Sequence, residues 1–238
     1  MASTSTSSPT PTPTSTSSPS SSAATPATAS RTTLYWSPGS CAMASHLALE
    51  HAGADYTGNR IDFSRQEQRT PDYLKLNPKG RVPVLVTAKG VLTETPAILL
   101  YIAQLHPGAG LAPLDDPFEL ARMNAFNSYL CSTVHVHHAH RVRGERWSDD
   151  AQVVQNLKLK VKQNMADSFA YIERDYLHGP WVLGNQFSTS DLYLFTIATW
   201  LAGDGVDVAT LPKVADHMQR VAALPAVAKI VALHSAAA

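Results

Sequence analysis

A strand pattern, a tight turn and a helix pattern follow one another near the start of the folded part of the chain. Residues 34–36 are rich in β-forming side chains, Pro38-Gly39 can reverse the chain, and apolar residues recur at helical spacing from Met43 onward. Cys41 therefore falls in the first turn of a helix, where unpaired N–H groups and the helix dipole favour a thiolate. The alternative is a small residue that packs behind a turn.

The segment 31–106 predicts a compact α/β domain. Two strand patterns flank the first helix, which gives a β-α-β unit with parallel strands and a right-handed crossover. We expect Thr95 to cap the last helix of this domain and Pro96 to occupy its first position. The expected strands lie at 31–36, 55–63, 83–86 and 91–92, and the expected helices at 41–53, 64–76 and from 95 onward.

The segment 107–117 is expected to be a linker, and 118–238 a helical domain. Asp116 and Pro117 are typical of a helix start. Ser188 and Asp191 resemble a capping box at the start of a helix that is apolar on nearly every side, which predicts the buried centre of the second domain.

Residues 1–30 contain only Ser, Thr, Pro, Ala and the initiator Met, so we expect a disordered tail and no signal peptide. The chain has 19 basic and 19 acidic residues, and this balance points to neither nucleic acid nor an anionic membrane surface. No apolar run approaches the roughly 20 residues needed to cross a bilayer. Two cysteines fit a reducing compartment, so a cytoplasmic location is expected.

Four motifs follow in order along the chain: Tyr35-Trp36-Ser37-Pro38-Gly39-Ser40-Cys41, Asn77-Pro78-Lys79-Gly80-Arg81-Val82-Pro83, 92–102 and 187–195. With these motifs, the chain from about 32 to 235 resembles a cytosolic glutathione transferase, and the first motif with His135 is similar to the bacterial beta class. The resemblance implies a thioredoxin-like N-terminal domain, an all-helical C-terminal domain, and a homodimer that binds glutathione between the domains.

The resemblance also implies roles for individual residues. Cys41 would lie beside the sulfur of glutathione and form a mixed disulfide with it, and His135 would close the site from the second domain. Val82 would present its backbone to the tripeptide, with Pro83 cis. The expected glutathione-binding residues are Ser40, Val82, Pro83, Glu94, Thr95 and Ser128, and Ser128 stands where the family often has an Asn that makes a cross-subunit contact.

Elementary chemistry supports part of this assignment without the resemblance. The γ-glutamyl end of glutathione is a zwitterion, so it needs a carboxylate for its ammonium and N–H donors for its own carboxylate. Glu94 supplies the first, and the helix start at Thr95 supplies the second. The alternative for Glu94 is an exposed carboxylate at the end of a strand.

A run of four histidines at 135–140 invites a metal hypothesis. On a helix, His135 pairs with His138 and His137 with His140, and imidazoles so placed can chelate Zn, Ni or Cu. The aspartate that a binuclear hydrolase pattern would need is replaced by Ala139. We therefore predict no metal site, and we expect solvated or interface histidines at His137, His138 and His140.

The sequence thus predicts a glutathione transferase of beta type that acts on small disulfides and electrophiles. A Cys41 thiolate would carry out thiol–disulfide exchange, with a pKa below the ~8.5 of free cysteine. The rival from another class is a non-catalytic protein of the same fold that binds glutathione or hydrophobic ligands. Cys131 lies one turn before His135, so it could also meet glutathione at the rim of the site.

Overall fold

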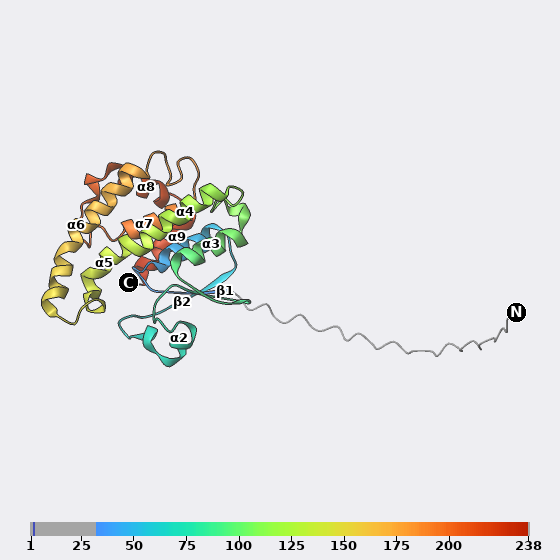
Figure 1. The fold of residues 1–238 in the computed structure, drawn as a ribbon, viewed down its shortest axis with the longest axis horizontal. Coiled ribbons are helices and arrows are strands. Elements are labelled where there is room, and N and C mark those ends of the chain that lie inside the picture. Colours follow the sequence, from blue (N-terminus) through green and yellow to red (C-terminus); the bar gives the residue numbers. More distant parts are fainter. Residues whose placement is uncertain (1, 3–31, 238) are drawn as a thin grey trace.

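A four-stranded sheet forms the base of the first domain (Figure 1). The computed structural model describes residue 2 and residues 32–237, and the predicted tail 1–30, apart from residue 2, lies outside the described residues. Strands β1 and β2 pair in parallel, and the other neighbouring pairs are antiparallel. The order is β2-β1-β3-β4, with bounds Thr32–Trp36 (β1), Tyr56–Arg60 (β2), Val84–Thr87 (β3) and Gly90–Thr93 (β4).

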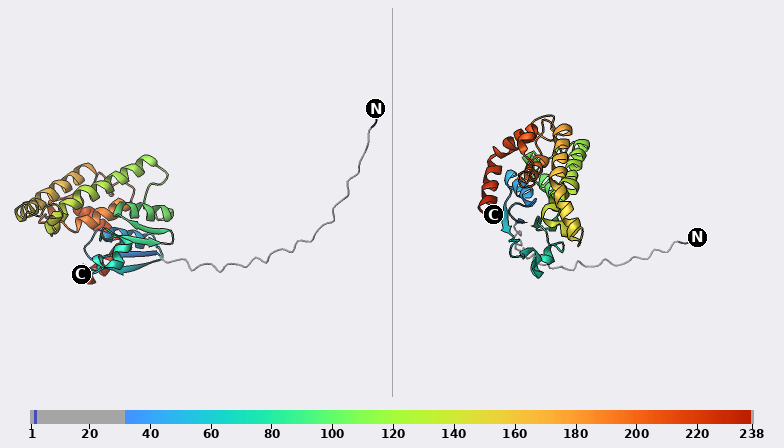
Figure 2. Two further views of the ribbon diagram at one scale, coloured as in Figure 1. Left: turned by 60° about the horizontal axis from the view of Figure 1, so that its bottom comes forward. Right: turned by 90° about the vertical axis from the view of Figure 1, so that its left-hand side faces the viewer.

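Helix α1 (Ala42–His51) is the element around which both domains pack. Its first eight residues are all buried, because it lies between the sheet and the helical domain and touches α3 (Thr95–Leu105), α7 (Thr189–Ala198) and α9 (Pro225–Ala236). Figure 2 shows the sheet and the helical domain as stacked layers. The residues at the start of α1 are therefore fixed in position by both domains.

The short helix predicted at 64–76 is divided in two. The first part is a 3-10 turn, and the second is α2 (Pro71–Leu76), on the other side of the sheet from α1 (Figure 1). Thr70 separates them because it adopts an extended conformation, and its hydroxyl accepts a hydrogen bond from the backbone N–H of Tyr73. This is the ordinary geometry of a helix cap.

The second domain is built from helices and short turns. The described elements beyond α3 are η2 (Pro107–Ala109), α4 (Pro117–Tyr129), the π-helical turn η3 (Leu130–Val134), α5 (His135–Arg143), η4 (Gly144–Arg146), α6 (Ala151–Asp175), α7, η5 (Val208–Thr210), α8 (Pro212–Ala222) and α9; the earlier 3-10 turn is η1 (Glu67–Arg69). No helix of the described residues is long and apolar enough to cross a membrane.

The predicted capping box lies at the centre of this domain. The fully buried Asp191 carboxylate accepts hydrogen bonds from the backbone N–H groups of Ser188 and Val182, both at 2.8 Å, and from Nε2 of His217 at 3.0 Å. Every residue of α7 is buried, as its apolar pattern predicts. The predicted fold class, a thioredoxin-like domain followed by a helical domain, is confirmed. The exact domain boundaries stay predictions.

Candidate active site between the two domains

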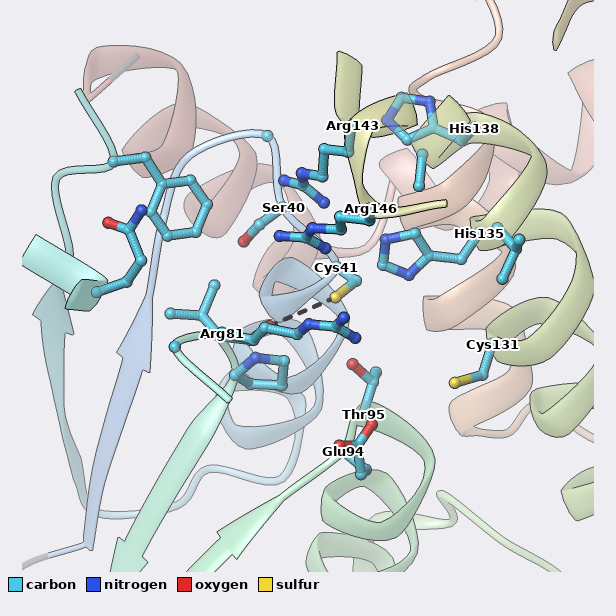
Figure 3. Close-up of a pocket in the computed structure, with 18 of the residues that line it drawn as sticks. Ser40, Cys41, Arg81, Glu94, Thr95, Cys131, His135, His138, Arg143 and Arg146 are labelled. Carbon is cyan, nitrogen blue, oxygen red and sulfur yellow. Dashed lines mark hydrogen bonds between the residues drawn. The ribbon is translucent and has the colours of Figure 1, made fainter. Parts of the chain in front are cut away.

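A cavity of about 340 Å³ lies where the start of α1 meets the helical domain (Figure 3). Seven of the eight predicted site residues line it: Ser40, Cys41, Val82, Pro83, Glu94, Thr95 and His135. They come from the α1 start, the β3 start, the α3 start and α5, so residues far apart in the sequence form one site. Ser128 does not line this cavity; it is exposed on α4.

Cys41 lies at the N-cap of α1, and its side chain is buried at the meeting point of the two domains. The residue is 8% exposed, and Sγ donates a hydrogen bond to the carbonyl oxygen of Val82 at 3.7 Å, the dashed line in Figure 3. Burial raises the pKa of the Cys41 thiol to about 11, while Thr95 and Arg143 lower it by less. The prediction of a depressed pKa is therefore wrong, because desolvation of the thiolate outweighs the helix start and the nearby cation.

The peptide bond between Val82 and Pro83 is cis, as the resemblance implies. The loop before it is fixed by two side chains, since the Tyr73 hydroxyl and the Asn77 amide both donate to the carbonyl oxygen of Arg81, at 2.7 and 2.8 Å. The Val82 backbone is thus held at the edge of the cavity, next to Cys41.

Glu94 has a backbone conformation that few side-chain-bearing residues adopt. Its φ is +71°, and such strain costs of order 1–3 kcal/mol and clusters at functional sites. The side chain is exposed and forms an ion pair with Lys79 at 2.5 Å. The predicted cap is wrong in detail: Glu94 is the N-cap of α3, and Thr95 lies in the first turn, where its side chain is buried beside Cys41.

His135 follows the π-helical turn directly. A π turn has i to i+5 hydrogen bonds, is rare, and often lies at functional sites. Cys131, inside this turn, and His135, directly after it, line the cavity, whereas Ser128 on α4 does not. Burial, with a smaller contribution from His138, lowers the pKa of His135 to about 3, so its imidazole is neutral.

His138 differs from the prediction, because it is buried and not solvated. Its Nδ1 lies 2.8 Å from Oδ2 of Asp204, and its ring stacks on Trp200 at 4.1 Å between centroids. The Trp200 indole N–H in turn donates to the carbonyl oxygen of Gly39 at 3.0 Å. The second domain thereby holds the turn that carries Cys41. No group of three His, Cys, Asp or Glu side chains among the described residues could hold a metal ion.

Sequence reasoning missed several residues of the site. Arg143 and Arg146 reach into the cavity from the end of α5 and the turn after it, and Arg81 enters from the opposite side (Figure 3). Tyr193 and Trp200 line it from α7 and the turn that follows. The Arg-x-x-Arg spacing at one helix end was the available signal, but two arginines at this spacing are equally typical of a solvent-exposed helix end.

The comparisons with known proteins agree with this geometry. The models "Glutathione S-transferase, N-terminal domain" and "Glutathione S-transferase, C-terminal domain" match residues 30–104 and 140–232. A crystal structure of a glutathione transferase homologue from Sulfitobacter, with bound glutathione, is 44% identical, covers 84% of this chain and 96% of its own, and has a TM-score of 0.81. The chain therefore belongs to the glutathione S-transferase family.

Two further relatives are similar over most of the chain. The structure named as a bacterial beta class glutathione S-transferase of Sphingomonas chungbukensis is 31% identical, with a TM-score of 0.74 and coverage of 85% of this chain and 98% of that one. Glutathione S-transferase GstA of Escherichia coli O157:H7 is 29% identical over 82% of this chain and 94% of its own length.

Proposed function

We propose that this protein is a glutathione transferase of beta type that binds glutathione and uses Cys41 for thiol–disulfide exchange with small disulfides. The observation that carries the proposal is the position of Cys41 Sγ, in a cavity lined by Val82, Glu94 and Thr95 from one domain and His135 from the other. The similarity to a beta class enzyme and to a homologue with bound glutathione supports it.

Glutathione is held in this proposal by the N-terminal domain. Glu94 binds the ammonium of the γ-glutamyl end, and the Lys79 ammonium is paired with Glu94 in its place in this structure. The start of α3 at Thr95 binds the γ-glutamyl carboxylate. The backbone of Val82 pairs with the extended tripeptide as an added strand would. Ser40 and the cis Pro83 complete the wall beside Cys41.

The exchange proceeds through a mixed disulfide. The Cys41 thiol first loses its proton to solvent. The thiolate then attacks one sulfur of the substrate disulfide, the S–S bond breaks, and the other half leaves as a thiolate that takes up a proton. The thiolate of glutathione then attacks the mixed disulfide and restores Cys41. Conjugation of glutathione to small electrophiles, a detoxification chemistry, is a second reaction of the same site and uses the thiol of glutathione itself.

Removal of the Cys41 sulfur tests the proposal. Cys41→Ala should lose at least about a hundredfold of its exchange rate with 2-hydroxyethyl disulfide while its glutathione dissociation constant changes within several-fold, because the tripeptide is held by other residues. Cys131→Ala, the matched control, should retain exchange. Alkylation of Cys41 by iodoacetamide in the control should rise about tenfold per pH unit above pH 7.

Two outcomes would contradict this proposal. Full exchange by Cys41→Ala would remove Cys41 from the mechanism. Tight glutathione binding by the unmodified protein without exchange or conjugation would favour the non-catalytic binding protein. An alkylation inflection below pH 8 would overturn only the raised pKa of Cys41 and would leave the exchange mechanism standing.

We also propose a homodimer in the cytoplasm, with the exposed Ser128 facing the partner. Phe118 on the same helix is 72% exposed, which a partner subunit would cover. Light scattering at several concentrations tests this assembly. A monomeric mass with full activity would contradict it.

A further inference from the structure

The cavity carries more positive charge than its own residues neutralise. Four arginines line it, and none of them belongs to an ion pair found among the described residues: Arg69, Arg81, Arg143 and Arg146. The one carboxylate among the described lining residues is Glu94, and Lys79 already neutralises it. Arg143 is half-buried and Arg69, Arg81 and Arg146 are exposed, so the guanidinium groups are both unneutralised and accessible to an anionic ligand.

The guanidinium groups of these arginines lie close enough to change one another's pKa values. Burial lowers the pKa of Arg146, and Arg143, Arg81 and Arg69 lower it further. Burial lowers the pKa of Arg143, Cys41 raises it by less, and Arg81 lowers it further. Figure 3 shows the side chains of Arg81, Arg143 and Arg146 reaching toward the space beside Cys41 from both domains. An anion placed there would meet several guanidinium groups at once.

Glutathione accounts for only part of this charge. It has two carboxylates and one ammonium, and its γ-glutamyl end is matched by Glu94 and the α3 start. One carboxylate remains, at the glycine end, and Arg81 adjoins Val82 in the domain that binds the tripeptide. Arg143 and Arg146, from the helical domain, are then left without an anion.

We propose that the second substrate carries a carboxylate and that Arg143 and Arg146 bind it. The proposal rests on the function proposed above and names its substrate class: small disulfides with acidic ends. The bond changes are those already given, and the leaving thiolate keeps its carboxylate. Phe63 and Trp147 provide apolar walls for the rest of the molecule.

Three disulfides of nearly equal length test the charge preference. Dithiodiglycolate ends in carboxylates, 2-hydroxyethyl disulfide in hydroxyls and cystamine in ammonium groups. We expect kcat/KM, divided by the uncatalysed rate with glutathione, to be about ten- to a hundredfold higher for the carboxylate than for the hydroxyl compound, and lowest for cystamine. Equal values for all three would overturn the proposal.

Variants locate the preference on the two arginines. In Arg143→Gln and Arg146→Gln the ratio of carboxylate to hydroxyl substrate should fall toward one. Arg122→Gln is the matched control, since Arg122 is paired with Glu119 on the outer side of α4 and should keep the ratio. An equal loss for all three disulfides would assign Arg143 to the Cys41 thiolate instead. A raised KM for glutathione with an unchanged ratio would assign it to glutathione.

A binding measurement separates this proposal from the proposed function. Thiodiglycolate is the thioether counterpart of the acidic disulfide and cannot undergo exchange. Calorimetry in the presence of glutathione should detect its binding to the unmodified protein and to Arg122→Gln, with at least about tenfold weaker binding to Arg143→Gln. Binding without exchange activity would leave the anion site standing and reject the transferase mechanism. No binding, with normal exchange of 2-hydroxyethyl disulfide, would reject the anion site alone.

Discussion

Two junctions fasten the helical domain to the unit formed by β1 and α1, and they use histidine in opposite ways. In the pocket junction, the Trp200 indole N–H donates to the carbonyl oxygen of Gly39, and His138 stacks on Trp200 and lies against the buried carboxylate of Asp204. In the α9 junction, His46 Nδ1 lies 3.1 Å from His234 Nε2, and the Trp36 ring lies 4.3 Å from that of His234, tilted by 31°. The carboxylate of Glu50 near His46 is bound by Tyr56 and Lys229.

The difference shows that a buried imidazole takes its character from its partner. In the pocket junction, the Asp204 carboxylate is paired with the Arg141 guanidinium and lies within hydrogen-bond distance of His138. A proton on His46 meets a second imidazole and little solvent. Burial, followed by His234, lowers the pKa of His46 to about 4, and burial lowers that of His234 to about 4. The pocket junction is therefore ionic, and the α9 junction is neutral.

Removal of the carboxylate from the pocket junction should have the largest effect on stability. Asp204 is fully buried and meets both His138 and Arg141, and loss of one partner from a buried ion pair typically costs 3–5 kcal/mol. Because Arg141 is partly exposed, we expect Asp204→Asn to lower the free energy of unfolding by about 3 kcal/mol in urea denaturation at fixed protein concentration.

The matched control is Asp175→Asn, which removes a carboxylate from a surface pair with Arg174. It should leave the free energy of unfolding within error, since exposed ion pairs contribute little. If the two variants lose equal stability, the ionic character assigned to the pocket junction is wrong.

Low pH should destabilise the α9 junction. Native His46 binds fewer protons between pH 6.5 and 4 than the unfolded chain does, so the stability it contributes at pH 7 is lost as the pH falls through this window. His46→Asn keeps a polar atom near the Nδ1 position and removes the titration. Its loss of stability relative to the unmodified protein should shrink by about 2 kcal/mol between pH 7 and pH 5.

Parallel urea titrations at the two pH values measure this change. His178→Asn, at an exposed imidazole that follows α6 and lies outside both junctions, measures the effect of a His-to-Asn change on the surface at the same two pH values. A constant difference for His46→Asn would mean that the α9 junction accepts a proton in the native state.

Local signals explain how much of the fold could be predicted from the sequence. The Pro38-Gly39 turn, the Ser188 capping box and the helix start at Asp116 each depend on a few neighbouring residues, and each occurs where the sequence indicates. The N-terminal half of the cavity follows from such motifs, since Val82 and Glu94 stand at the ends of strands and helices that the pattern marks.

The rest of the site depends on contacts that no local pattern encodes. Cys41 is buried under Val82, 41 residues away in the sequence, and this burial reverses the expected direction of its pKa shift. His138 finds Asp204 at a separation of 66 residues. The π turn before His135 changes the helical phase, and no local pattern in the sequence indicates it.

The smallest expected effect is a difference in stability that comes from one indole N–H in each junction. Trp200 and Trp36 are both buried, but the Trp200 N–H donates to Gly39, whereas the Trp36 N–H has no partner among the described residues. Substitution by Phe removes the N–H and a similar volume at each position. We expect Trp200→Phe to be less stable than Trp36→Phe by about 1 kcal/mol, the usual net contribution of a hydrogen bond.

The same pair of variants gives a functional readout. Trp200→Phe frees the turn that carries Cys41, so its exchange rate should fall, while Trp36→Phe should retain exchange because its indole contacts His46 and His234 away from the cavity. Urea denaturation and the 2-hydroxyethyl disulfide assay measure both quantities. Equal stability losses with equal exchange rates would mean that the bond to Gly39 holds neither the domain nor the turn, and that packing of the two indoles alone joins the domains.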